Sequence, residues 1–166
     1  MKNIILVGFM GTGKTVTAKL LAKQLKMRYV SIDGIIEEKE KRKIADIFVK
    51  DGEEFFRNIE SRIIKDISQE SGVVIDAGGG AVVREENIKN FKANGVVICL
   101  SASVNAVLSR TENQAHRPLL NVDNPKKRIE ELLARRAKYY AKADHTIDTT
   151  GLTIAEVVEK IKNTVL

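Results

Sequence analysis

A glycine-rich segment, GFMGTGKT at residues 8–15, constrains the fold more than any other feature of the chain. It contains the complete pattern G-x-x-x-x-G-K-[ST] of a phosphate-binding loop, through Gly8, Gly13, Lys14 and Thr15. The glycines let backbone N–H groups wrap around phosphate, and the following helix adds positive potential at its N-terminus. We expect Lys14 to reach the β- and γ-phosphates of a nucleotide and the Thr15 hydroxyl to bind Mg²⁺.

The rest of the chain alternates short apolar runs with longer amphipathic stretches. The apolar runs lack clean alternation, which is typical of strands buried on both faces of a parallel sheet. Strands are predicted at residues 3–8, 28–33, 72–80, 95–101 and 145–149. Helices are predicted at residues 14–26, 34–42, 53–71, 85–94, 103–112, 126–142 and after Thr153. The pattern predicts one α/β domain, residues 1–166, with a parallel sheet of about five strands between two helical layers.

Composition and charge indicate which kinds of partner, nucleic acid, membrane or small ligand, the protein is expected to bind. The net charge is +6, but basic and acidic residues are interleaved, as in IIEEKEKRK, and aromatic residues make up only 5% of the chain. An anionic small ligand explains this surplus as well as nucleic acid does, so we expect no nucleic-acid partner. No apolar stretch approaches the roughly 20 residues of a membrane span. We expect a cytoplasmic protein with no membrane partner.

Residues 112–125 fit neither helical nor strand periodicity and contain both prolines of the chain. A loop of this length in a compact domain is usually functional or disordered, and we interpret it as a lid. The phosphate-binding loop by itself indicates only a nucleoside triphosphate. The N-K-x-D element by which GTPases read the base is absent from the sequence. The small size and the predicted lid favour a small-molecule kinase.

Four further stretches identify a family. They are SIDGIIE (31–37), ADIFVKDGEEFFRNIE (45–60), VVIDAGGGAV (73–82), and RPLL (117–120) with ARRAKYY (134–140). In order and spacing, the chain closely resembles shikimate kinase over nearly its whole length. The resemblance implies a P-loop kinase of the nucleoside-monophosphate-kinase type with a substrate-binding helical region at about 33–60. It also implies ATP- and Mg²⁺-dependent phosphorylation of the 3-hydroxyl of shikimate, a step towards chorismate and the aromatic amino acids. We expect a monomer.

The resemblance also implies a substrate site whose residue types suit a hydroxylated ring carboxylate. Two arginines would bind the carboxylate bidentately, and Asp33, at the end of a predicted strand, would accept the proton or hydrogen bond of the attacking hydroxyl. The implied substrate-binding residues are Asp33, Phe48, Phe56, Arg57, Glu60, Gly78, Gly79, Gly80 and Arg136. Glu60 would orient Arg57 from three residues along a helix. Arg135 stays open as an alternative to Arg136, and the two phenylalanines suit a core as well as an apolar wall.

The implied nucleotide site consists of Gly11, Thr12, Gly13, Lys14, Thr15, Val16, Arg110 and Arg117. Arg110 resembles the arginine that stacks on adenine in the family. Arg117, at the start of RPLL, would move onto the β- and γ-phosphates and offset charge in the transition state. Lys14, Asp33 and Arg117 are therefore the predicted catalytic residues.

The match departs from the family at one position, because Ser31 stands where the family has the first aspartate of a D-x-D pattern. That aspartate usually helps to hold Mg²⁺ through its waters. Asp76 ends a short apolar strand, as the metal-binding aspartate of many P-loop enzymes does. We hypothesise that Asp76 replaces the lost carboxylate, so that Thr15 and Asp76, and Ser31 beside them, form the metal site. Two alternatives stay open: a gluconate-like sugar-acid kinase, and an ATP-binding regulatory protein with weak kinase activity.

Overall fold

Five parallel strands form the central sheet, in the order β2-β3-β1-β4-β5. The structure is a computed structural model that describes residues 1–112, 120 and 122–166. The strands are β1 (Asn3–Val7), β2 (Arg28–Ser31), β3 (Val73–Asp76), β4 (Gly95–Ser101) and β5 (His145–Asp148). The prediction of a parallel sheet of about five strands is confirmed.

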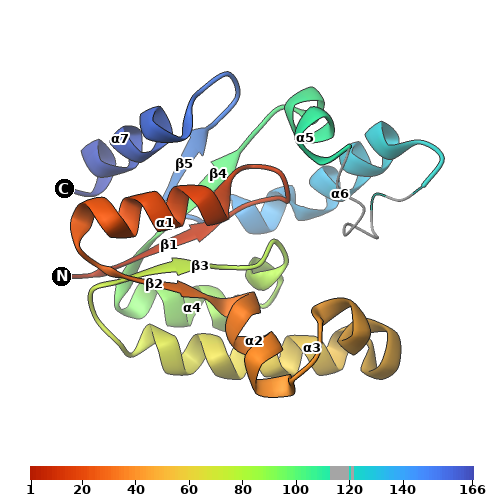
Figure 1. The fold of residues 1–166 in the computed structure, drawn as a ribbon, viewed down its shortest axis with the longest axis horizontal. Coiled ribbons are helices and arrows are strands. Elements are labelled where there is room, and N and C mark those ends of the chain that lie inside the picture. Colours follow the sequence, from red (N-terminus) through yellow and green to blue (C-terminus); the bar gives the residue numbers. More distant parts are fainter. Residues whose placement is uncertain (113–119, 121) are drawn as a thin grey trace.

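Helices cover both faces of this sheet (Figure 1). Helices α1 and α7 pack together on one face, and α3, α4 and α6 contribute to the apolar cluster on the other. The described helices are α1 (Lys14–Leu25), α2 (Ile32–Glu40), α3 (Ile44–Ser68), the 3₁₀ turn η1 (Ala81–Val83), α4 (Glu85–Ala93), α5 (Val104–Thr111), α6 (Pro125–Tyr140) and α7 (Ile154–Val165). The predicted three-layer α/β/α architecture is therefore observed.

Burial on both faces explains the unbroken apolar sequence of β1. Ile5 and Val7 point into the cluster shared with α3, α4 and α6, while Ile4 and Leu6 point into the cluster shared with α1 and α7. Each of the four side chains is at most 4% exposed. A strand at the centre of a two-sided sheet has no solvent face, so no polar residue alternates with the apolar ones.

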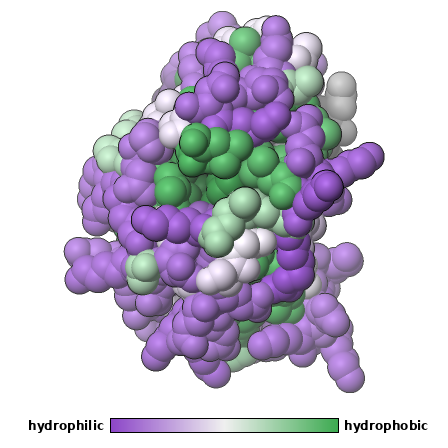
Figure 2. Space-filling view, turned by 90° about the vertical axis from the view of Figure 1, so that its left-hand side faces the viewer, coloured by the Kyte–Doolittle hydropathy of each residue, from purple (hydrophilic) through white to green (hydrophobic). Residues whose placement is uncertain are grey.

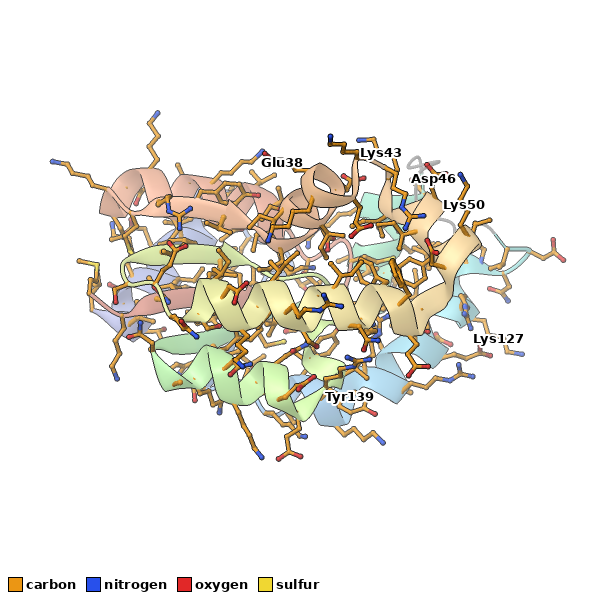
Figure 3. All side chains as sticks on the ribbon, turned by 90° about the horizontal axis from the view of Figure 1, so that it is seen from below. Glu38, Lys43, Asp46, Lys50, Lys127 and Tyr139 are labelled. Atoms are coloured by element: carbon orange, nitrogen blue, oxygen red, sulfur yellow. The ribbon has the colours of Figure 1, made fainter. Side chains whose placement is uncertain are left out.

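The α3 region differs from the prediction. Helix α3 begins at Ile44, nine residues before the predicted start at residue 53, because Ile47 is fully buried and anchors the first two turns. Gly52 interrupts the helix with φ 85° and ψ 171°, which a glycine adopts without a steric penalty. The charged side chains of Lys43, just before α3, and of Asp46 and Lys50, in its first part, face solvent (Figure 3).

All strands run in the same direction, so their carboxyl ends meet at one edge of the sheet, away from the two chain termini (Figure 1). The view of the opposite end shows a largely hydrophilic surface with an apolar area near its centre and more apolar surface towards its lower edge (Figure 2). Within the described ranges, no helix combines the length and apolar character that crossing a membrane requires. The predicted lid, about 112–125, lies largely outside the described residues.

Candidate active site

The phosphate-binding loop joins β1 to α1 at the carboxyl edge of the sheet. Gly13 precedes α1 in the left-handed region, with φ 88°, and Gly8 lies so close to β4 that a Cβ there would collide with the carbonyl group of Leu100. Both positions therefore require glycine. Lys14 Nζ donates hydrogen bonds to the carbonyls of Gly8 at 2.8 Å and Phe9 at 3.0 Å. The side chain thus folds back from the end of the loop to its first two residues.

Thr15, Asp76 and Ser31 come together beside this loop. The Thr15 hydroxyl donates a hydrogen bond of 2.6 Å to Asp76 Oδ2. Asp76 is the last residue of β3, and it pairs in register with Ser31 of β2 and with Leu6 of β1. The Ser31 hydroxyl accepts a hydrogen bond of 3.0 Å from the Gly34 N–H and caps α2. The three predicted metal-site residues are thus neighbours, joined through the register of β2 and β3.

The glycine triplet after β3 lies against charged side chains from two other elements. A Cβ on Gly78 would lie 3.0 Å from Asp33 Oδ1 and 3.4 Å from Glu60 Oε2. A Cβ on Gly80 would lie 2.6 Å from Cζ of Arg57. The absence of side chains on the triplet is what lets Asp33 of α2 and the Arg57–Glu60 pair of α3 approach the same backbone.

The middle glycine links this region to α6 and to the phosphate-binding loop. A Cβ on Gly79 would lie 3.3 Å from Nη1 of Arg136 and 3.4 Å from the Gly8 carbonyl oxygen. Tyr140, one turn after Arg136 on α6, donates a 2.8 Å hydrogen bond to the Gly79 carbonyl. Arg136 also lies over the Phe9 ring, 5.7 Å from its centroid. Tyr140 is not among the predicted site residues, although its i+4 spacing from Arg136 places both on one helix face.

Arg57 and Glu60 form a buried ion pair. Arg57 Nη1 lies 2.8 Å from Glu60 Oε1, and the two side chains are 11% and 0% exposed. Burial raises the pKa of Glu60, although Arg57 opposes the rise. Arg57 Nη2 lies 3.5 Å from the exposed Glu53 as well. Glu60 is therefore in position to orient the guanidinium, and its part in a substrate site stays a prediction.

Asp33 lies in the first turn of α2 and is half-buried. Burial raises its pKa, and so does the negative charge of Asp76, while Lys14 and Arg57 oppose the rise. Its Oδ1 is buried without a hydrogen-bond partner among the described residues, as are Glu60 Oε2 and Arg57 Nε. Two partnerless carboxylate oxygens beside Gly78 suit a ligand that carries hydroxyl donors.

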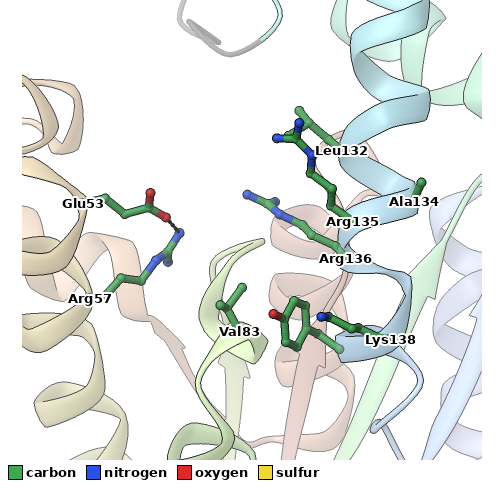
Figure 4. A pocket seen from close by; sticks show the side chains of 9 residues that line it. Glu53, Arg57, Val83, Leu132, Ala134, Arg135, Arg136 and Lys138 are labelled. Carbon is green, nitrogen blue, oxygen red and sulfur yellow. Dashed lines mark hydrogen bonds and ion pairs between the residues drawn. The ribbon is translucent and has the colours of Figure 1, made fainter.

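A pocket of about 520 Å³ opens between α3 and α6 (Figure 4), and Arg57 lines it, whereas Asp33 and Glu60 are not among its lining residues. Arg57 from α3 and Arg136 from α6 point into it from opposite sides (Figure 4). Its lining consists of Glu53, Arg57, Val83, Leu132, Ala134, Arg135, Arg136, Lys138 and Tyr139. Arg135 is exposed, whereas Arg136 is half-buried and lies against the glycine triplet. The geometry favours Arg136 over Arg135 as the carboxylate ligand.

The two phenylalanines occupy different environments. Their rings are in contact, with centroids 4.7 Å apart and an interplanar angle of 37°. Phe56 is 3% exposed and belongs to the core cluster, while Phe48 is 37% exposed. Phe56 is thus mainly a core residue that supports Arg57, whose Cζ lies 5.1 Å from its ring centroid.

Arg110 of α5 lies beside the phosphate-binding loop. It donates hydrogen bonds of 3.1 Å to the Gly11 carbonyl and to the hydroxyl and carbonyl of Thr149, after β5. Thr12, which is 2% exposed, ties the loop internally through a 2.7 Å bond to the Phe9 carbonyl. Val16, by contrast, is 57% exposed in the first turn of α1. Arg117 lies outside the described residues.

Comparison with known proteins points to one family. The family model described as shikimate kinase matches residues 10–166. The chain is 51% identical over 161 residues to a shikimate kinase of Thermodesulfovibrio yellowstonii, covering 97% of this chain and 93% of that protein. It is 42% identical to a shikimate kinase of Caldanaerobacter subterraneus subsp. tengcongensis, with coverage of 97% and 94%.

Solved structures agree with the sequence matches. Shikimate kinase from Acinetobacter baumannii in complex with shikimate superposes with a TM-score of 0.94 at 34% identity, covering 99% of this chain and 93% of that one. Shikimate kinase from Aquifex aeolicus superposes with a TM-score of 0.82 at 31% identity, covering 98% and 94%. Sequence and fold agree, and the chain belongs to the shikimate kinase family.

Proposed function

We propose that this protein transfers the γ-phosphoryl group of ATP to the 3-hydroxyl of shikimate. The observation that carries the proposal is the position of the glycine triplet, which lies between the phosphate-binding loop and the charged pocket. Gly79 approaches Gly8 of the loop and Arg136, while Gly78 approaches Asp33. A phosphate donor on the loop and an acceptor hydroxyl at Asp33 would therefore be direct neighbours.

The acceptor side suits a hydroxylated ring acid. Arg57 and Arg136 approach the pocket from α3 and α6, and their guanidinium groups match a carboxylate bidentately. The partnerless oxygens Asp33 Oδ1 and Glu60 Oε2 suit the ring hydroxyls. Asp33 Oδ1 would accept the proton or the hydrogen bond of the attacking hydroxyl, and Phe48 would cover the apolar edge of the ring.

The donor side is formed by the phosphate-binding loop and α5. Backbone N–H groups of Gly11, Thr12 and Gly13 would bind the phosphates, and Lys14 would neutralise their charge. Arg110, held by Gly11 and Thr149, would pack against the adenine. Arg117 is proposed to offset charge on the transferring group from the lid, on the strength of the sequence resemblance alone.

The residues beside Thr15 fit a magnesium ion. The donors are all oxygens, from one hydroxyl and one carboxylate, which is the ligand chemistry that Mg²⁺ prefers. Because the Thr15 hydroxyl donates its hydrogen bond to Asp76, the lone pairs of the Thr15 oxygen remain available for the metal. When bound, the metal would neutralise charge on the β- and γ-phosphates. Asp76 would hold metal-bound water, with Ser31 beside it.

The register of Ser31 with Asp76 supports the exchange of a carboxylate between the two strands. Asp76→Ser should raise the Mg²⁺ concentration needed for half-maximal turnover, and adding Ser31→Asp should restore much of the affinity. An Mg²⁺ requirement that does not change in Asp76→Ser would return Asp76 to a purely structural role.

The function is tested with purified protein, ATP and Mg²⁺, supplied in parallel with shikimate, quinate and gluconate. Formation of shikimate 3-phosphate, identified by mass spectrometry, is the expected result. Preferred phosphorylation of gluconate would instead favour the sugar-acid kinase, and ATP binding without turnover would favour the regulatory protein. Lys14→Ala should abolish transfer while shikimate binding persists. We further propose that the protein acts as a single-domain monomer in the cytoplasm.

A further inference from the structure

Tyr29 is a half-buried residue of β2 whose phenolic OH donates a 3.2 Å hydrogen bond to Asp76 Oδ2. Thr15 donates its 2.6 Å bond to the same oxygen. Within the described part of the chain, both hydrogen bonds that Asp76 accepts from side chains thus fall on Oδ2. The Asp76 carboxylate is therefore held from two elements, β2 and α1, through the same oxygen.

The ring of Tyr29 is held by its surroundings. In the β2–β3 ladder Tyr29 pairs with Val74, two residues before the Ser31–Asp76 pair, so all four residues share one face of the sheet. Tyr29 packs against the apolar cluster beneath α1 and α7. Lys19, one helical turn after Thr15, places its Nζ 5.6 Å from the ring centroid. The position of the phenolic oxygen is therefore set by packing.

The phenol is a constant hydrogen-bond donor. Burial, followed by the negative charge of Asp76, raises the pKa of Tyr29 to about 12. The OH of Tyr29 therefore keeps its proton and can donate it in the hydrogen bond to Asp76 Oδ2.

We propose that Tyr29 is a positioning residue of the magnesium site, whose OH holds the Asp76 carboxylate in the orientation that supports the metal beside Thr15. The proposal rests on the proposed function, in which Asp76 serves the metal. Partners that orient metal ligands from outside commonly change metal affinity by about 10- to 100-fold when they are removed. A tyrosine that merely satisfied its own OH in the core would have no such effect.

The test is Tyr29→Phe, which keeps the ring and removes only the OH. Binding of Mn²⁺ to the complex of the enzyme with ADP is measured by electron paramagnetic resonance, independently of turnover. We expect the Mn²⁺ affinity to fall about tenfold. The Mg²⁺ requirement for turnover should rise in parallel, while kcat at saturating Mg²⁺ and the KM for shikimate stay near the wild-type values.

Two further variants separate positioning from general destabilisation. Lys19→Met removes the cation over the ring but keeps the phenol, and it should leave Mn²⁺ affinity unchanged. In an Asp76→Ser background, Tyr29→Phe should cause no additional loss, because its effect passes through the carboxylate. Unchanged Mn²⁺ affinity in Tyr29→Phe, or an equal loss with and without Asp76, would overturn the proposal.

The proposed function and this inference fail in different ways. Wild-type protein that does not phosphorylate shikimate would refute the function, whereas the Mn²⁺ titration with ADP requires no acceptor and still measures the role of Tyr29. Active wild-type protein with an insensitive Tyr29→Phe variant would refute only the inference.

Discussion

Gly80→Ala tests the link between the glycine triplet and the carboxylate-binding arginine. Gly80 has φ −100° and ψ 3°, so alanine meets no left-handed backbone there and the effect is one of space. The new Cβ would lie 2.6 Å from Arg57 Cζ and 2.8 Å from its Nη1. The guanidinium must retreat by about 1 Å to reach ordinary contact, and a displacement of this size can cost about 100-fold in a positioned site.

The expected result is a large loss of shikimate binding with an intact nucleotide site. Losing one bidentate partner of the carboxylate costs about 2–5 kcal/mol, so the Kd for shikimate should rise by about 30-fold or more. The Kd for ADP should not change. Retreat of Arg57 also loosens its 2.8 Å contact with the fully buried Glu60, and overpacking of this kind typically costs about 1–3 kcal/mol of stability.

Isothermal titration calorimetry is the appropriate assay, because the chain contains no tryptophan to report binding by fluorescence. Gly72→Ala is the control for stability. Gly72 has φ 72°, and a Cβ there would meet no atom within 4 Å, so the variant should lower the melting temperature through backbone strain without affecting shikimate binding. In an Arg57→Ala background, Gly80→Ala should add no further loss. A wild-type Kd in Gly80→Ala, or an equal loss without Arg57, would refute the steric reasoning.

Three other outcomes follow from the site. Arg136→Ala should raise the shikimate Kd by about 30-fold or more, and Arg135→Ala, at an exposed side chain, by about threefold at most; equal calorimetric losses would show that Arg135 shares the carboxylate. Asp33→Asn should abolish turnover yet raise the melting temperature at neutral pH, since burial disfavours the charged form of Asp33 and the amide carries no charge; a lower melting temperature would contradict this. Because burial raises the pKa of Asp33 and Glu60 above 3.8 and 4.5, the stability they contribute at low pH is lost as pH rises through their folded-state pKa values. Urea unfolding of Asp33→Asn should therefore show a flatter decline with pH than wild type.

The local sequence determined the secondary structure and the sheet architecture of this protein. The phosphate-binding loop, the five strands and the parallel sheet could be predicted because backbone conformation and two-sided burial leave periodic and compositional marks on short segments. The neighbourhood of Ser31 and Asp76 also followed, since both end strands whose carboxyl ends share one edge. The start of α3 could not be predicted. The segment before Gly52 is held by one fully buried side chain, Ile47, and it carries no periodic apolar pattern that would indicate a helix.

Tertiary structure decided which side chains share the site. Nothing in the sequence tells that Gly80 faces Arg57 or that Tyr29 reaches Asp76, 47 residues away along the chain. The sequence also did not decide whether Arg135 or Arg136 would bind the carboxylate. The rotation of α6 against the glycine triplet favours Arg136. The physical reason is that periodicity encodes whether a residue is buried, whereas its partner depends on how separate elements cross, and that is set by packing across the whole core.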